Sequence, residues 1–367
     1  MSLNIDFRLA DNWKMEIEET IKAINSDGLP LVLFGNIFFP AVSRFLQNLH
    51  VDISYICDNN PEKRKYSFYD CKAIAPADLN KLFQTKKYNV FILPKIYENE
   101  ISEQLKNLKS SPNHIYCLDL YYYNSDPNFI YENMDKIKKV YNLLADDLSR
   151  DTYQATINYR ISRNIDFIKL FAKPTVEQYF DSDIISLNDT ETFFDGGAFV
   201  GDTIAEFIKQ SKGKYKDVYA FEPERENYLK LESFSQQYKN IHTFQIGLSD
   251  NTNIGRINSL GMGSSIGEMG DETVKVDSID NILSQVDHPD ATFIKMDIEG
   301  FECKALKGAS NTIHKFKPKL AICMYHSIED MMNVPLLIHE IEPGYSLYIR
   351  HYSHGIAETV CYAVYNR

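Results

Sequence analysis

The sequence predicts an α/β protein with two parallel sheets in separate domains. Short apolar segments alternate with helix-like segments through the first 120 residues, and the alternation returns from residue 192. Strands that are spaced by helices form parallel sheets covered on both faces. A chain of 367 residues is also too long for one average domain. We predict a smaller N-terminal α/β domain at residues 1–122, a helical connector at 123–185 and a larger α/β domain at 186–367.

Four apolar runs are the predicted strands of the N-terminal domain, at residues 31–34, 53–57, 89–93 and 114–118, with a helix at 41–49. Gly35 directly follows the first run. Asp58 directly follows the second run and lies 23 residues after Gly35. A strand, a glycine turn, a helix and a second strand followed by an acid resemble the Rossmann arrangement that binds nucleotides. We therefore predict a Rossmann-like N-terminal domain.

The segment after Gly35 departs from the nucleotide-binding pattern. It lacks the second and third glycines of G-x-G-x-x-G, and the bulky Phe38 and Phe39 would crowd a pyrophosphate. We interpret the domain as a degenerate fold used for substrate recognition or dimerisation, which makes a homodimer plausible. The alternative is that this domain binds a nucleotide or a nucleotide-sugar.

The connector and the C-terminal domain follow from periodicity. Residues 134–168 are charged and carry apolar residues at helical spacing, at Ile137, Val140, Tyr141 and Leu144. Five predicted parallel strands follow, at residues 192–194, 218–221, 242–246, 293–296 and 320–324. The tail offers two more strands, at 345–350 and 359–365, which we expect to form an antiparallel hairpin at a sheet edge.

Composition narrows the class of partner and the compartment. The formal charge of −12 disfavours a nucleic acid partner. The sequence contains no run of 18 apolar residues, so we expect no transmembrane helix. The first 20 residues lack the basic start and apolar stretch of a secretory signal peptide, so we do not expect secretion. The six cysteines lie far apart and match no metal-binding spacing. We therefore expect a protein of the reducing cytoplasm.

The strongest motif is a strand that runs into glycines before a helix. Its residues are Asp195, Gly196, Gly197, Ala198, Phe199, Gly201, Asp202 and Thr203. Gly197 lets the backbone approach a ligand, because a Cβ would intrude. The helix that opens after Gly201 offers N–H groups to an anion. In S-adenosylmethionine that anion is the methionine carboxylate, and Asp195 would accept from the α-ammonium group.

Two further segments complete the predicted cofactor site. Glu222 ends the second strand, 25 residues after Gly197, where doubly wound folds place an acid on the ribose hydroxyls. Pro223 then ends that strand. At the end of the third strand, Gly247, Ser249 and Asp250 are predicted to flank the adenine, with Asp250 accepting from its amino group.

Other interpretations of these glycines are open. The spacing Gly197-x-x-x-Gly201 is not G-x-G-x-x-G, which counts against a nicotinamide-dependent oxidoreductase, and no Gly-Lys-Ser/Thr follows to form a P-loop. The structural alternative is a tight turn with a solvated Glu222. A third alternative is a non-catalytic nucleotide-binding scaffold whose acceptor site has decayed.

Residues 175–367 resemble the FkbM family of S-adenosylmethionine-dependent methyltransferases. The stretches that carry the resemblance are Glu177 to Asp181, Phe194 to Thr203, Ala220 to Pro223, Val274 to Asp280 and Ile294 to Glu302. Their order over half the chain is more specific than any one of them. The resemblance implies a seven-stranded class I methyltransferase sheet that ends in the tail hairpin. It also implies O-methylation, often of a sugar in a surface polysaccharide or of another small molecule.

The predicted catalytic residues follow the fourth and fifth strands of that sheet, because ligands bind outside the carboxyl ends of parallel strands. We predict that His326 is the general base and that Asp297 and Glu299 orient the acceptor or the histidine. Asp297 is also counted with the cofactor site. The same three residues resemble a loose metal set, but pairing of the carboxylates with basic neighbours is the favoured interpretation. Lys295 is predicted to pair with an acid.

Two clusters are predicted to bind the acceptor. Ser264 and Ser265 lie in a loop of small residues that could cover the cofactor or hold a sugar. Arg350 and His351 lie between the tail strands and would bind an anionic acceptor, although an exposed hairpin turn is an equal alternative. Asp277 is predicted to cap a helix that starts at Ser278.

Overall fold

The computed structural model describes residues 3–35, 53–65, 71, 73–93, 97–118, 127–257, 266–267, 272–287, 289–353 and 355–365. The chain forms two compact units. The N-terminal unit comprises Ile5–Glu132 and Ile157–Phe167, and the C-terminal unit comprises Met1–Asn4, Asn133–Thr156 and Ile168–Arg367. The domain boundaries predicted after residues 122 and 185 stay predictions.

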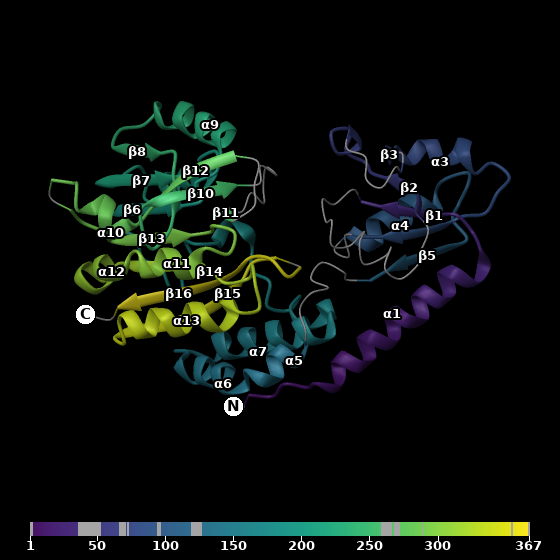
Figure 1. Cartoon of the computed structure of the whole chain (residues 1–367), viewed down its shortest axis with the longest axis horizontal. Helices are drawn as coiled ribbons and strands as arrows, with labels where there is room; N and C mark the ends of the chain where they lie inside the picture. Colours follow the sequence, from purple (N-terminus) through teal and green to yellow (C-terminus); the bar gives the residue numbers. More distant parts are fainter. Residues whose placement is uncertain are drawn as a thin grey trace. The chain divides into compact units, whose positions relative to one another are not determined.

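The N-terminal unit contains a five-stranded parallel sheet (Figure 1). Its order is β3 (Ala73–Ile74), β2 (Ile53–Cys57), β1 (Leu31–Phe34), β4 (Asn89–Ile92) and β5 (His114–Cys117). The helices are α1 (Arg8–Asp27), α3 (Pro76–Leu82), α4 (Glu98–Lys106) and α5 (Pro127–Glu132). The four predicted strands are confirmed. The two-residue β3 is too short to show a pattern, and the helix predicted at 41–49 lies outside the described residues.

Within the predicted connector, α5 is followed by α6 (Met134–Leu143) and α7 (Asp147–Ser162), and then by the short η3 (Ile165–Phe167) and η4 (Thr175–Glu177). The break falls at Leu144, whose backbone is extended. Ala145 N donates to Leu347 O over 2.8 Å, and Lys173 N donates to His351 O over 2.9 Å. The backbone at Ala145 and at Lys173, both in the C-terminal unit, therefore pairs with the outer strand of its sheet, which would otherwise leave these carbonyl groups unpaired.

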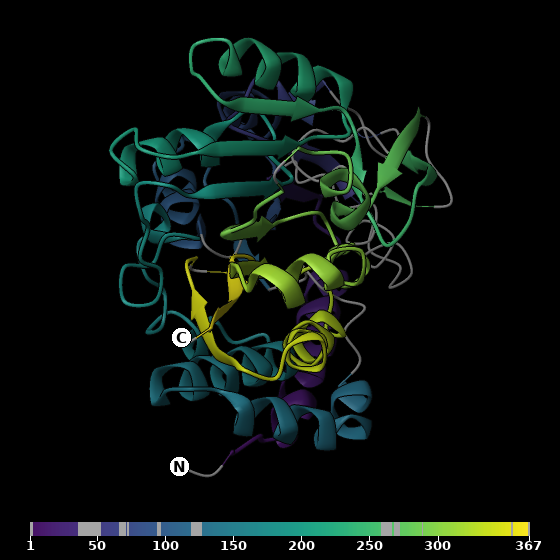
Figure 2. The same cartoon turned by 90° about the vertical axis from the view of Figure 1, so that its left-hand side faces the viewer.

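The C-terminal unit is built on a seven-stranded sheet, seen from two directions in Figures 1 and 2. Its order is β15 (Tyr345–His351), β16 (Thr359–Tyr365), β14 (Lys319–Cys323), β13 (Phe293–Met296), β6 (Thr192–Gly196), β7 (Asp217–Phe221) and β8 (Ile241–Phe244). β16 runs antiparallel to both of its neighbours, which confirms the antiparallel hairpin predicted for the tail. The strand order reverses at β6, because β7 and β8 lie on one side and β13 on the other. This reversal is the position where doubly wound sheets bind ligands.

The helices that the structure describes between and beside these strands are α8 (Asp202–Gln210), α9 (Arg225–Ser235), α10 (Ile279–Leu283), α11 (Glu302–Lys307), α12 (Ser310–Phe316) and α13 (Asp330–Ile341). The apolar residues of α8 recur at helical spacing and are buried, with Phe207 stacked on Phe193 of β6 at 4.6 Å between ring centroids. This packing fixes the start of α8 beside the end of β6. α13 contacts α11, α12 and the tail hairpin.

A second sheet of four short strands was not predicted. Its order is β11 (Ile266–Gly267), β10 (Asn253–Ile257), β12 (Glu272–Asp277) and β9 (Gly247–Leu248). The third parallel strand therefore ends at Phe244, and the prediction that Gly247 ends it is wrong. The cap of α10 is also corrected. Ser278 is the N-cap and accepts from Asn281 N, while the Asp277 carboxylate accepts from Ser278 N.

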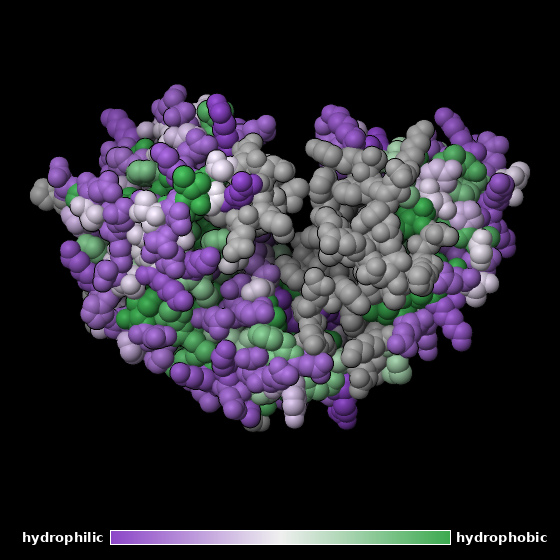
Figure 3. All heavy atoms as spheres, viewed as in Figure 1, coloured by the Kyte–Doolittle hydropathy of each residue, from purple (hydrophilic) through white to green (hydrophobic). Residues whose placement is uncertain are grey.

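The surface of both units is mainly hydrophilic on the face shown in Figure 3, where hydrophobic side chains form separate patches. Scattered apolar residues of this kind are normal on a folded protein. Among the residues that the structure describes, no helix is long and apolar enough to cross a membrane.

Candidate active site

The glycine loop after β6 is shaped by the end of β13. Gly197 has φ +74°, and a Cβ on it would lie 1.9 Å from the carbonyl oxygen of Asp297. The space beside Gly197 that we predicted for a ligand is instead filled by the backbone of Asp297, directly after β13. Glycine is required here because two chain segments approach closely across the reversal of strand order.

The loop leaves the start of α8 open to a ligand. Gly201 is the N-cap residue in the left-handed region, with φ +94°, and no side chain caps the first turn. A Cβ at Gly201 would meet the ring of Phe234 at 2.5 Å. Asp202 is exposed and Thr203 half-buried in this first turn. The N–H groups of a helix start without a side-chain cap attract an anion.

Glu222 ties the end of β7 to the glycine loop. One carboxylate oxygen accepts from Phe199 N over 3.0 Å, and the other accepts from Glu224 N over 2.9 Å. The residue is 6% exposed, and burial raises the pKa of its carboxyl to about 7. Each carboxylate oxygen has a second lone pair for a further donor. The alternative of a solvated Glu222 is therefore wrong. Pro223 lies half-buried in the turn that follows.

A buried ion pair lies beneath the loop. Lys295 Nζ is 3.0 Å from Asp195 Oδ1 and donates to the carbonyl oxygens of Gly196 and Gly197 over 3.1 and 2.9 Å. Asp195 is completely buried, and burial raises the pKa of its carboxyl to about 6 in spite of the lysine charge. The predicted pairing of Lys295 with an acid agrees with this geometry. The carboxylate of Asp195 faces the lysine, and its contact with a ligand ammonium group stays a prediction.

Asp297 is the centre of a polar cluster at the end of β13. Its Oδ2 accepts from the Tyr179 hydroxyl over 2.8 Å, and its Oδ1 accepts from the Tyr325 hydroxyl over 3.1 Å. Burial alone would raise the pKa of this carboxyl. The hydrogen bond from His326 and the charge of Lys295 outweigh burial and hold the pKa well below its usual range.

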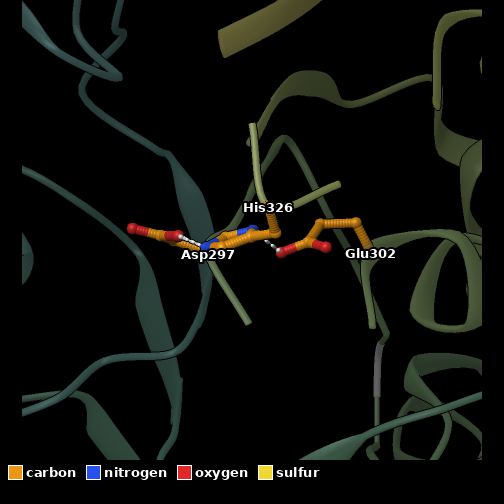
Figure 4. Close-up of side chains that lie close together, drawn as sticks. All are labelled: Asp297, Glu302 and His326. Carbon is orange, nitrogen blue, oxygen red and sulfur yellow. Dashed lines mark ion pairs between the residues drawn. The ribbon is translucent and has the colours of Figure 1, made fainter. Parts of the chain in front are cut away.

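His326 lies between two carboxylates (Figure 4). Its Nε2 is 3.3 Å from Asp297 Oδ1, and its Nδ1 is 3.1 Å from Glu302 Oε1. Burial would lower the pKa of His326, but the hydrogen bonds to Asp297 and Glu302 raise it well above the usual value. A buried imidazole with a carboxylate facing each ring nitrogen is favoured in its protonated form, the imidazolium. Because an imidazolium holds its proton, this geometry disfavours the predicted general base role of His326.

Glu299 contributes less to this cluster. Its Oε2 is 3.5 Å from His326 Nε2, and its side chain is 38% exposed. Its backbone has φ +56°, which is uncommon for a residue with a side chain. Burial raises the pKa of Glu299.

Asp297, Glu302 and His326 have ligand atoms that all lie within 4.8 Å of one another and so could hold a metal ion. This set differs from the predicted one, because Glu302 takes the place of Glu299. The carboxylates already face the protonated imidazole on both sides. Ion pairing therefore accounts for the cluster.

The remaining predicted residues lie in different environments. Gly247 and Ser249 are buried, and exposed Asp250 accepts from the Asn251 side chain over 3.0 Å. Their role beside the adenine stays a prediction. Ser264 and Ser265 lie outside the described residues.

Arg350 and His351 are not in a hairpin turn, which corrects both interpretations of their position. They are the last two residues of β15 and are 3% and 0% exposed. Arg350 Nη2 lies 2.7 Å from Asp146 Oδ2, and His351 Nδ1 lies 2.9 Å from the Thr359 hydroxyl. Arg350 thus anchors the α6–α7 segment to the edge strand, and the geometry does not favour acceptor binding.

Sequence reasoning missed several members of the cluster, including Tyr179, Tyr325 and Glu302. Tyr179 lies over 110 residues before Asp297, and the hydrogen bond between them spans that separation. The signal that could have found Tyr179 and Glu302 is their presence in the stretches that carry the family resemblance.

Comparisons with known proteins agree with this geometry. Residues 195–343 match the methyltransferase FkbM domain. The structure resembles the crystal structure of methyltransferase FkbM from Methylobacillus flagellatus KT, with 23% identity, a TM-score of 0.71 and 97% of each chain covered. No curated protein matches the sequence.

Two structures with lower similarity have a bound cofactor or product. Aeropyrum pernix fibrillarin in complex with S-adenosyl-L-methionine has 10% identity and a TM-score of 0.34, covering 51% of this chain and 72% of that one. A putative methyltransferase from Streptococcus mutans in complex with SAH has 13% identity and a TM-score of 0.33, covering 50% and 93%.

The strand order, its reversal at β6 and the glycine loop define a class I S-adenosylmethionine-dependent methyltransferase fold. Within this fold, residues 195–343 form an FkbM methyltransferase domain.

Proposed function

We propose that this protein transfers the methyl group of S-adenosylmethionine to a hydroxyl group of a sugar, a surface glycan or a related small molecule. The observation that carries this proposal is the position of Asp297. Its carboxylate lies at the reversal of strand order, beside the glycine loop, and is surrounded by hydroxyl and imidazole donors. Methyl transfer is favoured over the nicotinamide and scaffold alternatives because it is the activity of the matched domain.

The donor groups around the loop fit the cofactor. The open start of α8 suits the methionine carboxylate, and the carboxylate of Glu222 can accept from the ribose hydroxyls on its second lone pairs. Lys295 holds the loop in one conformation through Gly196 and Gly197. The bound cofactor supplies an activated methyl group on a sulfonium, so that the protein mainly has to align the acceptor.

The polar cluster around Asp297 would align the acceptor. Tyr179 and Tyr325 donate to Asp297, and His326 lies at ion-pair distance from it, so that the three together fix the orientation of its carboxylate. A carboxylate held in this way can accept a hydrogen bond from an incoming hydroxyl group. We propose that Asp297 orients the acceptor and that His326 positions Asp297, with its own position set by Glu302.

Methyl transfer from labelled S-adenosylmethionine tests this function. The full chain is incubated with monosaccharides, nucleotide-sugars and extracted surface polysaccharide, and the labelled product is hydrolysed and identified by mass spectrometry. We expect an O-methyl sugar, and Asp297→Asn should reduce its formation at least 100-fold. Label on nitrogen or carbon, or no label transfer to any of these acceptors, would overturn the assignment.

We also propose that the N-terminal unit helps to recognise the acceptor or forms a dimer, and that the protein acts in the cytoplasm. The buried thiols of Cys57, Cys323 and Cys361 support a reducing compartment. Calorimetric titration of the full chain with nucleotide-sugars tests whether a second ligand binds. Sedimentation at several concentrations tests the dimer.

A further inference from the structure

Glu358 lies at the same edge of the sheet as the Asp297 cluster. It directly precedes β16, which runs antiparallel to β14, so the start of β16 lies beside the carboxyl end of β14. The pairing of Cys323 with Val360 and the bond from Met324 N to Thr359 O, 3.0 Å long, fix this register. The chain therefore places Glu358 next to the segment that carries Tyr325 and His326.

The backbone around Glu358 is held in an unusual conformation. Its φ is +67°, a left-handed value that costs energy for a residue with a side chain. Its carbonyl oxygen accepts from Tyr352 N over 3.0 Å. The hydroxyl of Ser353 donates to Ala357 O over 2.6 Å and closes the turn before it. Strain of this kind persists where the surrounding structure fixes it and is common at functional sites.

The side chain of Glu358 has one carboxylate oxygen available. Gln178 donates its side-chain amide to Oε2. Oε1 has no hydrogen-bond donor among the residues that the structure describes. Gln178 directly precedes Tyr179, whose hydroxyl binds Asp297, so the same short segment orients both carboxylates.

The titratable groups whose charges act on Glu358 come from several segments. They are Lys295 and Asp297 of the β13 end, His326 after β14, and the hydroxyl and thiol groups of Tyr179, Tyr325 and Cys323. Burial, and then the negative charge of Asp297, raise the pKa of Glu358 to about 7. Asp297 itself has a lowered pKa and is a weak base, and His326 is already protonated. Burial also raises the pKa of Glu299, but its side chain is 38% exposed and faces His326. Glu358, with a pKa of about 7 and one carboxylate oxygen without a donor, is therefore the better placed of the two to take up a proton near neutral pH.

We propose that Glu358 is the general base that accepts the proton of the acceptor hydroxyl, a role that rests on the proposed O-methyl transfer. The hydroxyl oxygen attacks the methyl carbon, and the carbon–sulfur bond breaks. Its electron pair stays on sulfur, which becomes the neutral thioether of S-adenosylhomocysteine. The hydroxyl proton moves to Oε1 of Glu358 and later passes to solvent. Asp297 orients the same hydroxyl.

Glu358→Gln tests this role because glutamine keeps the shape of the side chain but cannot take up the proton. In the full chain we expect the single-turnover rate of methyl transfer to fall about 100-fold or more. The affinity for S-adenosylhomocysteine should stay within about twofold. The wild-type rate should rise with pH to a plateau, with its midpoint near 7, and the variant should lack this midpoint. Glu206→Gln on α8, which removes an ion pair with Lys209, is the matched carboxylate-to-amide control.

Gln178→Met supplies a readout that a purely structural role would not change. The hydrogen bond from Gln178 lowers the pKa of Glu358, so its loss should move the midpoint of the pH profile to higher pH while transfer persists. If Glu358→Gln keeps the wild-type rate and pH profile while the wild type methylates a hydroxyl, the base is another group and the proposed function stands. If the wild type binds S-adenosylhomocysteine but methylates only nitrogen or carbon, or no acceptor tried, the O-methyl transfer and the role of Glu358 both fail.

Discussion

The two parallel sheets of this protein share a local pattern but differ in chemistry. In both, a buried strand runs into a glycine and the next strand is followed by an acid. In the C-terminal unit the residue before the glycine is Asp195, and it pairs across the sheet with Lys295. In the N-terminal unit the matching position is Phe34, and it pairs with Ile92. An apolar pair thus replaces a buried ion pair that binds loop carbonyl groups.

The acids after the second strand of each pattern, Glu222 and Asp58, also differ in whether they connect two loops. Glu222 accepts from the backbone of the neighbouring glycine loop and so joins two strand ends. Asp58 accepts through Oδ1 from Asn60 N in its own turn. The comparison teaches that a strand, a glycine and an acid predict a sheet. A ligand site needs, in addition, polar groups that connect the loops to one another.

Of the changes that separate the two units, breaking the ion pair between Asp195 and Lys295 should have the largest effect on stability and cofactor binding. Lys295→Met leaves the buried carboxylate of Asp195 without its cation, which costs about 3–5 kcal/mol, and it frees the glycine loop. We expect a lower unfolding temperature for the C-terminal unit and loss of S-adenosylhomocysteine binding, measured by circular dichroism and calorimetry. Ile92→Val, at the matching position, should cost only about 0.5–1.5 kcal/mol.

The double variant Asp195→Leu with Lys295→Met sharpens this test. Apolar residues of similar volume often replace a buried ion pair without loss of stability. We therefore expect recovered stability but weak cofactor binding, because the loop carbonyls of Gly196 and Gly197 lack their donor. Wild-type stability in Lys295→Met alone would contradict the account of the ion pair.

Gly197→Ala should have the next largest effect. The added methyl group would lie 1.9 Å from the Asp297 carbonyl oxygen, and the alanine backbone would have to keep a φ of +74°. We expect a cost of about 2–4 kcal/mol from overpacking and backbone strain together. Gly213→Ala is the control, because Gly213 has φ +73° but open space around it, and about 1 kcal/mol is expected. Equal losses in denaturant titrations of the two variants would show that contact with β13 is unimportant.

The pH dependence of cofactor binding should show a smaller effect that separates Glu222 from Asp58. The pKa of Glu222 is raised from 4.5 to about 7. The folded state therefore binds more protons than the unfolded state between these values, and this residue lowers stability as pH rises through that window. The ribose hydroxyls donate to the ionised form, so affinity for S-adenosylhomocysteine should rise about tenfold from pH 6 to pH 8.

Glu222→Gln should remove most of this rise, and Asp58→Asn should leave it intact. Calorimetry across this pH range measures both. A rise that persists in Glu222→Gln would assign the titration to another group, with Asp195 as the first one to examine because its pKa is about 6.

Removal of metal ions should have the smallest effect. The imidazolium of His326 already balances Asp297 and Glu302, so methyl transfer in excess chelator should stay within about twofold of the untreated enzyme. A loss of activity that returns on addition of Mg²⁺ would instead assign Asp297, Glu302 and His326 to a metal site.

Much of the fold was predictable because its signals are local. Buried strands such as Leu31–Phe34 are short apolar runs, and the glycine that follows this one marks where it ends. The small sheet that contains Gly247 was missed, since its shortest strands have two residues and show no period. The burial of Arg350 at the end of its strand was missed, because its partner Asp146 lies 204 residues away in the chain.

By itself, the sequence determined the α/β class, most of the long strands, the glycine loop and the acid at Glu222. Only the tertiary structure decided what these residues do. It brings Lys295 beneath the loop, places His326 between two carboxylates, and sets Glu358 beside the segment that carries His326. The physical reason is that periodicity acts between near neighbours in the chain, whereas the charge of a buried group depends on partners that folding brings together from distant segments.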